Sequence, residues 1–164
     1  MDPLRELLAS DQRQTLKFFL LWLKDVSEAS VDPQELLYNA SVLAHYAQVS
    51  TASDGEMPIA STLVTLFDKF VLDTTTANDP AMMEIAGAQC LLLSGFFEDQ
   101  MRRRHNIRWY ASLGATFFNR AAAHQKSPAK ARLLEALAER FEPWRQRQAR
   151  LSRELRVSPY VIRD

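Results

Sequence analysis

The chain has 164 residues, of which 47% are hydrophobic and 24% are charged, as in an ordinary globular domain. A chain of this length buries enough surface to fold without disulfides or metals, and its one cysteine, Cys90, excludes a disulfide framework and a cysteine-ligated zinc site. The four glycines lie too far apart to form a phosphate-binding loop, which argues against P-loop and Rossmann nucleotide sites.

Charge is divided unevenly along the chain, although the net charge is zero at pH 7. Residues 1–82 have 5 Lys or Arg and 12 Asp or Glu, a net charge of −7, whereas residues 83–164 have 15 and 8, a net charge of +7. Such halves can attract each other within one fold, pair head to tail in a dimer, or leave a basic surface for an acidic partner.

Nothing in the sequence predicts a membrane segment. The longest stretch without charge, residues 85–97, is shorter than the roughly 20 residues of a membrane-spanning helix. Asp2, Arg5 and Glu6 precede any apolar run, unlike in a signal peptide. We therefore expect a cytoplasmic protein with no membrane partner.

Proline and capping residues mark the starts of the predicted helices. Asp2 and Pro3 predict a short opening turn, and Ser10 predicts the N-cap of a helix that runs to about residue 27. The apolar residues on one face of this helix are Leu16, Phe19, Leu20 and Leu23.

Two further helices are predicted in the first half. Asp32 and Pro33 open one that runs to about residue 49, and Glu35 completes its capping signal. Pro58 opens the next, which runs to about residue 73.

The fourth predicted helix, at about residues 80–97, begins at Asp79 and Pro80 and is apolar on nearly every side. We expect it to lie at the centre of the fold. Gly95 near its end suits a left-handed C-cap.

A basic connector over residues 102–106 leads to a fifth helix, in which Gly114 costs about 1 kcal/mol of helix propensity relative to alanine. A close helix crossing would explain this glycine. Ser127 and Pro128 then open the last helical segment, which Pro143 should kink or split after Glu142, because proline disrupts the preceding turn.

No run of alternating apolar residues predicts a strand. The sequence therefore predicts an all-α fold, a single-domain bundle of about six helices with a central apolar helix and a Pro-kinked C-terminal helix. The domain spans residues 1–156, followed by a tail over residues 157–164.

No pattern of catalytic or metal-binding residues is present. No Asp or Glu lies three or four residues from a histidine, as helical di-metal sites require. The apolar neighbours of Cys90 should raise the pKa of its thiol, and Ser94 lacks the strand and elbow of a hydrolase nucleophile. We expect no catalytic residue, metal or cofactor, although the sequence leaves open whether the protein is an enzyme.

One histidine suggests a ligand pocket. Tyr38, His45 and Tyr46 are the candidate polar groups of a small-ligand site, with His45 a candidate haem ligand. The alternative is a helix packed between neighbours, with His45 hydrogen-bonded to a carbonyl.

The basic connector has two interpretations. Arg102, Arg103, Arg104 and Arg108 lie among aromatic residues, as on nucleic-acid-binding surfaces. Alternatively, they complement the C-terminal dipole of the fourth helix and pair with carboxylates of the acidic first half.

The most distinctive feature is a basic amphipathic segment over residues 143–156. Its narrow apolar seam consists of Trp144, Gln148, Leu151 and Leu155. Its wide basic face contains Arg145, Arg147, Arg150, Arg153 and Arg156. The seam has coiled-coil spacing, so it predicts docking on a partner helix or a second copy; the alternative is a helix packed on its own domain with a solvated arginine face.

Several residues of the second half resemble a pattern in a group of all-helical bacterial proteins with no assigned activity. The pattern contains the run Ser94-Gly95-Phe96-Phe97, the pair Trp109-Tyr110, then Gly114 and Phe141. The resemblance covers about residues 84–142 and implies a bacterial cytoplasmic helical domain.

The leading hypothesis is a non-enzymatic helical interaction or regulatory protein that binds a protein partner, or itself as a homodimer, through the basic C-terminal segment. Nucleic-acid binding by the arginine clusters is the first alternative. Small-ligand or haem binding around His45 is the second.

Overall fold

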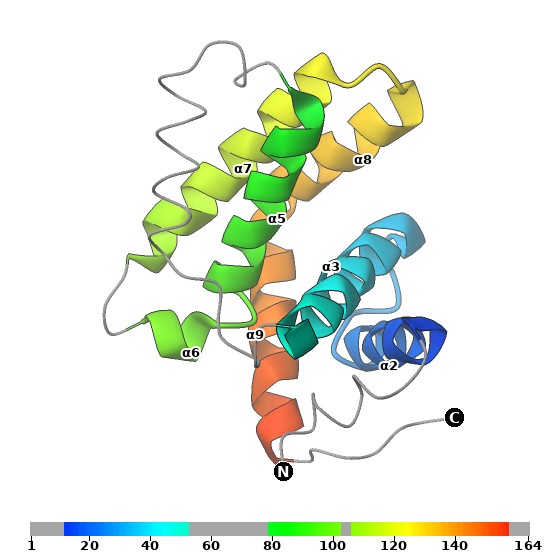
Figure 1. Ribbon diagram of the computed structural model, residues 1–164, viewed down its shortest axis with the longest axis vertical. Coiled ribbons are helices and arrows are strands. Elements are labelled where there is room, and N and C mark those ends of the chain that lie inside the picture. Colours follow the sequence, from blue (N-terminus) through cyan, green and yellow to red (C-terminus); the bar gives the residue numbers. More distant parts are fainter. Residues whose placement is uncertain (1–11, 53–78, 103–105, 158–164) are drawn as a thin grey trace. The chain divides into compact units, whose positions relative to one another are not determined.

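The computed structural model describes residues 12–52, 79–102 and 106–157, and all secondary structure in these ranges is helical (Figure 1). The predicted all-α class is thus confirmed. The helices group into two compact units: α2, α3 and the C-terminal part of α9 form one, and α5 to α8 with the first residues of α9 form the other. None of the described helices combines the length and apolar character needed to cross a bilayer.

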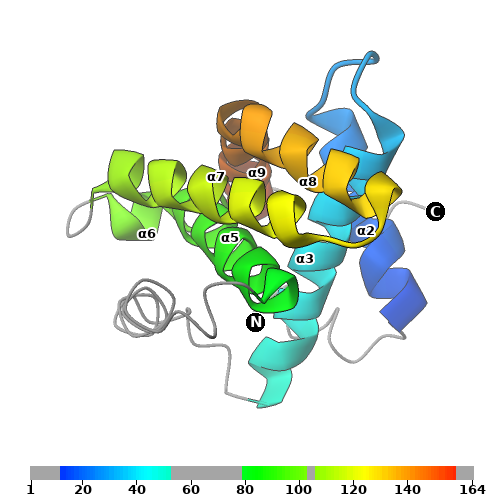
Figure 2. The ribbon, with the colours of Figure 1, turned by 90° about the horizontal axis from the view of Figure 1, so that it is seen from above.

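The first unit is built on two packed helices, α2 (Gln12–Asp25) and α3 (Pro33–Ala52), which lie side by side (Figure 1 and Figure 2). Phe19 and Leu23 of α2 and Leu43 of α3 are fully buried between apolar faces of helical periodicity. Asp32 begins α3 as predicted, because its Oδ1 accepts hydrogen bonds from the backbone N–H groups of Gln34 (2.9 Å) and Glu35 (3.1 Å).

The second unit is organised around α5 (Pro80–Ser94), which packs against α7 (Ile107–His124), and α7 also packs against α8 (Pro128–Glu139) (Figure 2). Asp79 begins α5 as predicted, since its side chain accepts from two backbone N–H groups of the first turn. The predicted central apolar helix is therefore present, although one side of it reaches solvent at Ile85.

The end of α5 differs from the prediction of a left-handed C-cap. Gly95 has φ −101° and ψ −83°, outside the left-handed region, and its N–H donates to the carbonyl of Leu91 at 2.8 Å, in the helical pattern. The chain instead turns through Phe96 and Phe97 into the short helix α6 (Glu98–Met101). A left-handed residue is not needed because the carbonyl of Ser94 receives a side-chain donor from a distant helix, described below.

The close crossing predicted at Gly114 is confirmed. A Cβ on this glycine would lie 2.5 Å from Cζ of Phe141 and 2.8 Å from Cβ of Cys90, inside van der Waals contact. Only glycine allows α7 to approach these two side chains so closely.

The last helical segment is split, as Pro143 predicts, but the break lies earlier than residue 142. Helix α8 ends at Glu139, and α9 (Phe141–Val157) begins after Arg140. Pro143 then occupies the first turn of α9, where a missing N–H costs nothing. Its ring would clash with the carbonyl four residues back, that of Glu139, so α8 cannot continue through this point.

Several predictions fall outside the described residues. These are the turn at Asp2 and Pro3, the Ser10 N-cap, the helix over residues 58–73, the connector residues Arg103, Arg104 and His105, and the tail beyond residue 157.

Candidate functional site

The apolar seam of α9 is buried within the chain. Trp144, Gln148 and Leu151 have no exposed surface, and Leu155 is also buried. The burial matches the alternative of a helix packed on its own domain, and it corrects the docking of this seam on a partner, because a seam that the chain already buries has no apolar surface left to offer.

A buried amide pair fixes the middle of the seam. Nε2 of Gln148 donates to Oδ1 of Asn39 on α3 at 2.8 Å, and Nδ2 of Asn39 donates to the carbonyl of Glu35 at 2.9 Å. Gln148 and Asn39 are both fully buried. The polar residue that the sequence places in the seam thus aligns α9 with α3.

The opposite side of α9 is exposed and basic. Arg150, Arg153 and Arg156 lie on it, and we call these three residues the α9 arginine face. Nε of Arg150 donates to Glu154 at 3.3 Å, and Nε of Arg156 donates to the carbonyl of Ser152 at 3.4 Å. Both side chains are exposed, and a guanidinium has five N–H donors. Arg147 is only half-buried.

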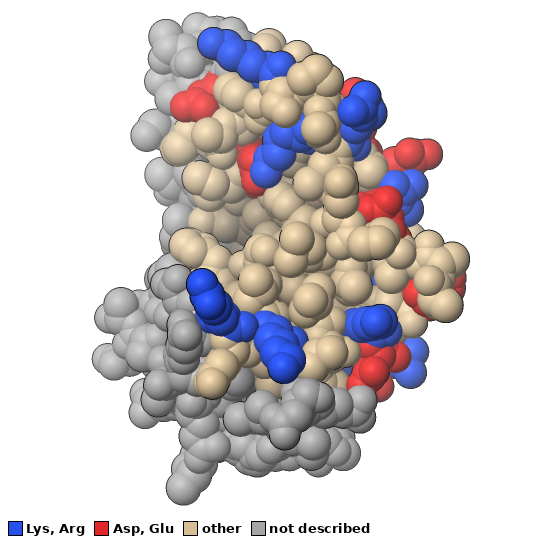
Figure 3. All heavy atoms as spheres, turned by 90° about the vertical axis from the view of Figure 1, so that its right-hand side faces the viewer, with Lys and Arg blue, Asp and Glu red and all other residues tan. Residues whose placement is uncertain are grey.

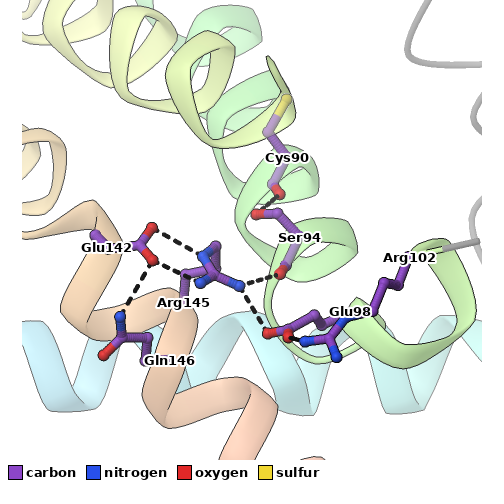
Figure 4. Close-up of polar contacts among 7 residues, drawn as sticks. All are labelled: Cys90, Ser94, Glu98, Arg102, Glu142, Arg145 and Gln146. Atoms are coloured by element: carbon purple, nitrogen blue, oxygen red, sulfur yellow. Dashed lines mark hydrogen bonds and ion pairs between the residues drawn. The ribbon is translucent and has the colours of Figure 1, made fainter. Parts of the chain in front are cut away.

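Arg145 does not belong to that exposed face, because its side chain is only 13% exposed. Its Nη1 donates to Glu98 at 2.7 Å and to the carbonyl of Ser94 at 3.1 Å, while Nε and Nη2 form a bidentate pair with Glu142 at 2.8 and 2.5 Å (Figure 4). Arg145 therefore ties the first turn of α9 to the end of α5 and is corrected from a partner-binding residue to an internal one.

The charges of this cluster stabilise one another. The hydrogen bond from Arg145 lowers the pKa of Glu142 despite the opposing effect of burial, and the bond to Glu142 raises the pKa of Arg145. Arg102 also donates to Glu98, four residues earlier (Figure 4). One interpretation of the basic connector pairs its arginines with carboxylates of the acidic first half, but the partner of Arg102 in the structure, Glu98, belongs to the second half.

The described part of the basic connector lies at the surface. The side chain of Arg102 is 64% exposed, and Arg108 is exposed near Glu142, whose pKa it also lowers. Trp109 is 42% exposed, and its ring meets that of Tyr110 edge to face, with centroids 4.9 Å apart. Of the predicted mixture of cations and aromatic rings, Arg108 and Trp109 are adjacent in the sequence and are both exposed.

The predicted pocket residues differ in their exposure. His45 is exposed, Tyr38 is half-buried and Tyr46 is buried. An enclosed ligand or haem site requires a buried imidazole, which the exposed His45 does not provide.

Cys90 is a core residue, as its apolar neighbours indicate. It has no exposed surface, and burial raises the pKa of its thiol to about 12. Ser94 is buried beside it and donates to the carbonyl of Cys90 at 2.6 Å (Figure 4). Within residues 12–52, 79–102 and 106–157, no three His, Cys, Asp or Glu side chains gather as a metal site would require.

Two residues that position α9, Glu98 and Asn39, are not among the predicted site residues. The sequence around each of them nevertheless indicates a buried or paired side chain. Glu98 precedes Arg102 by one helical turn, the spacing of a helical ion pair. Asn39 lies next to the apolar stripe of α3 and is buried with it. A polar residue at such a place needs a partner, but the sequence does not say which.

Comparisons with known proteins identify no relative. A scan against protein-family models, a search of curated proteins and a search of solved structures each gave no match.

Proposed function

We propose that the protein is a helical interaction module that binds an acidic segment of a protein partner through the α9 arginine face. One observation supports this most directly: α9 buries its apolar seam and leaves Arg150, Arg153 and Arg156 exposed on the other side. Arg150, Arg153 and Arg156 belong to the basic C-terminal segment to which the sequence-based hypothesis assigns partner binding.

The anchoring of the C-terminal part of α9 in its own unit favours this function. Gln148 bonds to Asn39 of α3, and Leu151 and Leu155 are buried. Guanidinium groups at one-turn intervals on an anchored helix lose little conformational freedom on binding, and they match carboxylates in a bidentate geometry.

An acidic peptide binding assay tests the proposal. The double variant R150Q/R153Q removes two exposed charges, and the matched control K17Q/K24Q removes two exposed charges from α2 in the same unit. The probe is a fluorescein-labelled glutamate-rich peptide, followed by anisotropy at low salt. Each exposed ion pair is worth about 0.2–1 kcal/mol, so we expect the α9 variant to bind roughly two- to thirtyfold more weakly and the control to bind like wild type.

Equal weakening in both double variants would mean that the peptide senses only net charge, and this would contradict a specific α9 site. Light scattering of the same proteins separates binding of a partner from self-association. A dimer that dissociates only in R150Q/R153Q would replace the acidic partner with a second copy of the chain.

A further inference from the structure

The solvent-facing side of α7 combines an exposed indole with cations and short polar groups. At 100° per residue, its exposed residues fall within an arc of about 160°. They are Arg108, Trp109, Ser112, Thr116, Asn119, Arg120, Ala123 and His124. We call this set the α7 outer face.

The α7 outer face has a distinct charge pattern. Residues 107–124 contain Arg108 and Arg120 but no Asp or Glu. The charge of Arg108 helps to lower the pKa of Glu142, whereas Arg120 is exposed about three turns further along the helix. On the side of the molecule that Figure 3 shows, basic and acidic side chains of the described residues are interspersed.

Trp109 is the only one of the three tryptophans that reaches solvent to a large extent. It is 42% exposed, whereas Trp22 and Trp144 are buried. The buried Tyr110 ring meets it at an interplanar angle of 81°, which restricts the indole while part of its surface stays open. A restrained, exposed aromatic ring is a platform on which a planar ligand can stack.

We propose that the α7 outer face binds single-stranded nucleic acid, with a base stacked on Trp109 and phosphates contacted by Arg108 and Arg120. Ser112 and Asn119 lie between these arginines and supply neutral donors for phosphate and sugar oxygens, whereas the Thr116 hydroxyl donates to the carbonyl of Ser112. A protein partner fits this surface less well, because a protein interface needs an apolar centre and Trp109 is the only large apolar side chain here.

Intrinsic fluorescence tests the proposal directly, because the buried Trp22 and Trp144 are shielded from the ligand. The full chain is titrated with a thymidine 12-mer at 50 and 200 mM salt. We expect saturable quenching of Trp109 and an affinity that falls as salt is raised, since phosphate contacts release counterions. Binding detected by anisotropy of a labelled 12-mer without any fluorescence change would overturn stacking on Trp109.

Variants with matched controls locate the site. W109A should weaken 12-mer binding at least fivefold by anisotropy, whereas I85A, which truncates an exposed apolar side chain on α5, should leave it unchanged. R108Q/R120Q should weaken binding and flatten its salt dependence, whereas K126Q/R132Q, which removes two other exposed charges, should not. Circular dichroism checks that each variant is folded.

Two further probes decide the class of ligand. Tighter binding of a duplex of the same length would overturn the preference for single strands, and equal displacement of the 12-mer by polyglutamate would mean that the face binds acidic polymers without regard to bases. R150Q/R153Q should bind the 12-mer like wild type, so this inference and the proposed function can fail separately.

Discussion

At the scale of single residues, the close contacts of small and polar side chains determine how the helices fit together. Gly114 lets α7 approach Phe141 and Cys90, and the amide pair of Gln148 and Asn39 fixes α9 on α3. Both arrangements are buried, so neither tolerates a change that adds volume or leaves a polar atom without a partner.

Replacing Gly114 by alanine should destabilise the protein. The new Cβ would lie 2.5 Å from the Phe141 ring and 2.8 Å from Cys90 Cβ. Overpacking of this kind costs about 1–3 kcal/mol, more than the roughly 1 kcal/mol gained in helix propensity. We expect a net loss of up to about 2 kcal/mol in chemical denaturation. G87A is the control, since its Cβ meets only the Phe118 ring at 3.0 Å or more; an equal loss there would argue against a special crossing at Gly114.

The amide pair should show strong coupling in a double-mutant cycle. N39L and Q148L each leave a buried amide without its partner, at a cost of about 1–3 kcal/mol, whereas N39L/Q148L removes both polar groups. We expect the double variant to be more stable than the sum of the single losses predicts, as measured by urea denaturation. Additive losses would show that the hydrogen bond does not couple the two helices.

At the scale of elements, α9 is positioned by charge at its first turn and by burial along the rest of its length. The bidentate pair of Arg145 with Glu142 lies within α9, and the bonds of Arg145 to Glu98 and to the Ser94 carbonyl reach α6 and the end of α5. Arg145 therefore acts as a C-cap for α5 supplied from another helix, which is why Gly95 needs no left-handed conformation.

The ion pair of Glu142 and Arg145 should make the folded protein less stable at acid pH. Because the pKa of Glu142 is lowered in the folded protein, the stability it contributes is present above its unfolded pKa and is lost as pH falls through the folded pKa. The Glu142 side chain is 55% exposed, so the effect should stay below about 1 kcal/mol. In thermal melts between pH 7 and pH 3, E142Q should lose less stability than wild type. E139Q, an exposed carboxylate of α8, should follow the wild-type curve; if it behaves like E142Q, the pair with Arg145 is not the cause.

At the scale of the whole molecule, the net charges of the two halves, −7 and +7, add up to zero. The ion pairs around α9 and α5 use Glu84, Glu98, Glu142 and Glu154, all from the basic second half. The two surfaces that we propose bind ligands, the α9 arginine face and the α7 outer face, also belong to this half.

The solubility of the protein should depend on pH through its net charge. The net charge is zero at pH 7, so mutual repulsion between molecules is weakest there, while patches of opposite sign can attract each other. We expect a solubility minimum near pH 7 at low ionic strength that added salt relieves. Precipitation midpoints in polyethylene glycol, measured from pH 5 to pH 9 at two salt concentrations, check this; a solubility that rises steadily with pH would contradict it.

The sequence by itself determined the helical class and most helix starts, because these depend on local chemistry. Asp32 and Asp79 cap their own helices, and Pro143 ends the helix before it. Gly114 in the middle of a helix predicts that another element packs closely against it. Hydrophobic periodicity likewise predicted that the seam of α9 would be buried against something, but gave no means to tell a partner from the chain itself.

Only the tertiary structure decided what covers that seam and which charges are internal. Trp144 and Leu151 are buried by the chain's own fold, Arg145 binds carboxylates 3 and 47 positions away, and Arg150 stays at the surface, although all four residues belong to one amphipathic helix. Helical spacing places side chains on a face, whereas the neighbour of that face depends on long-range packing that local sequence does not encode.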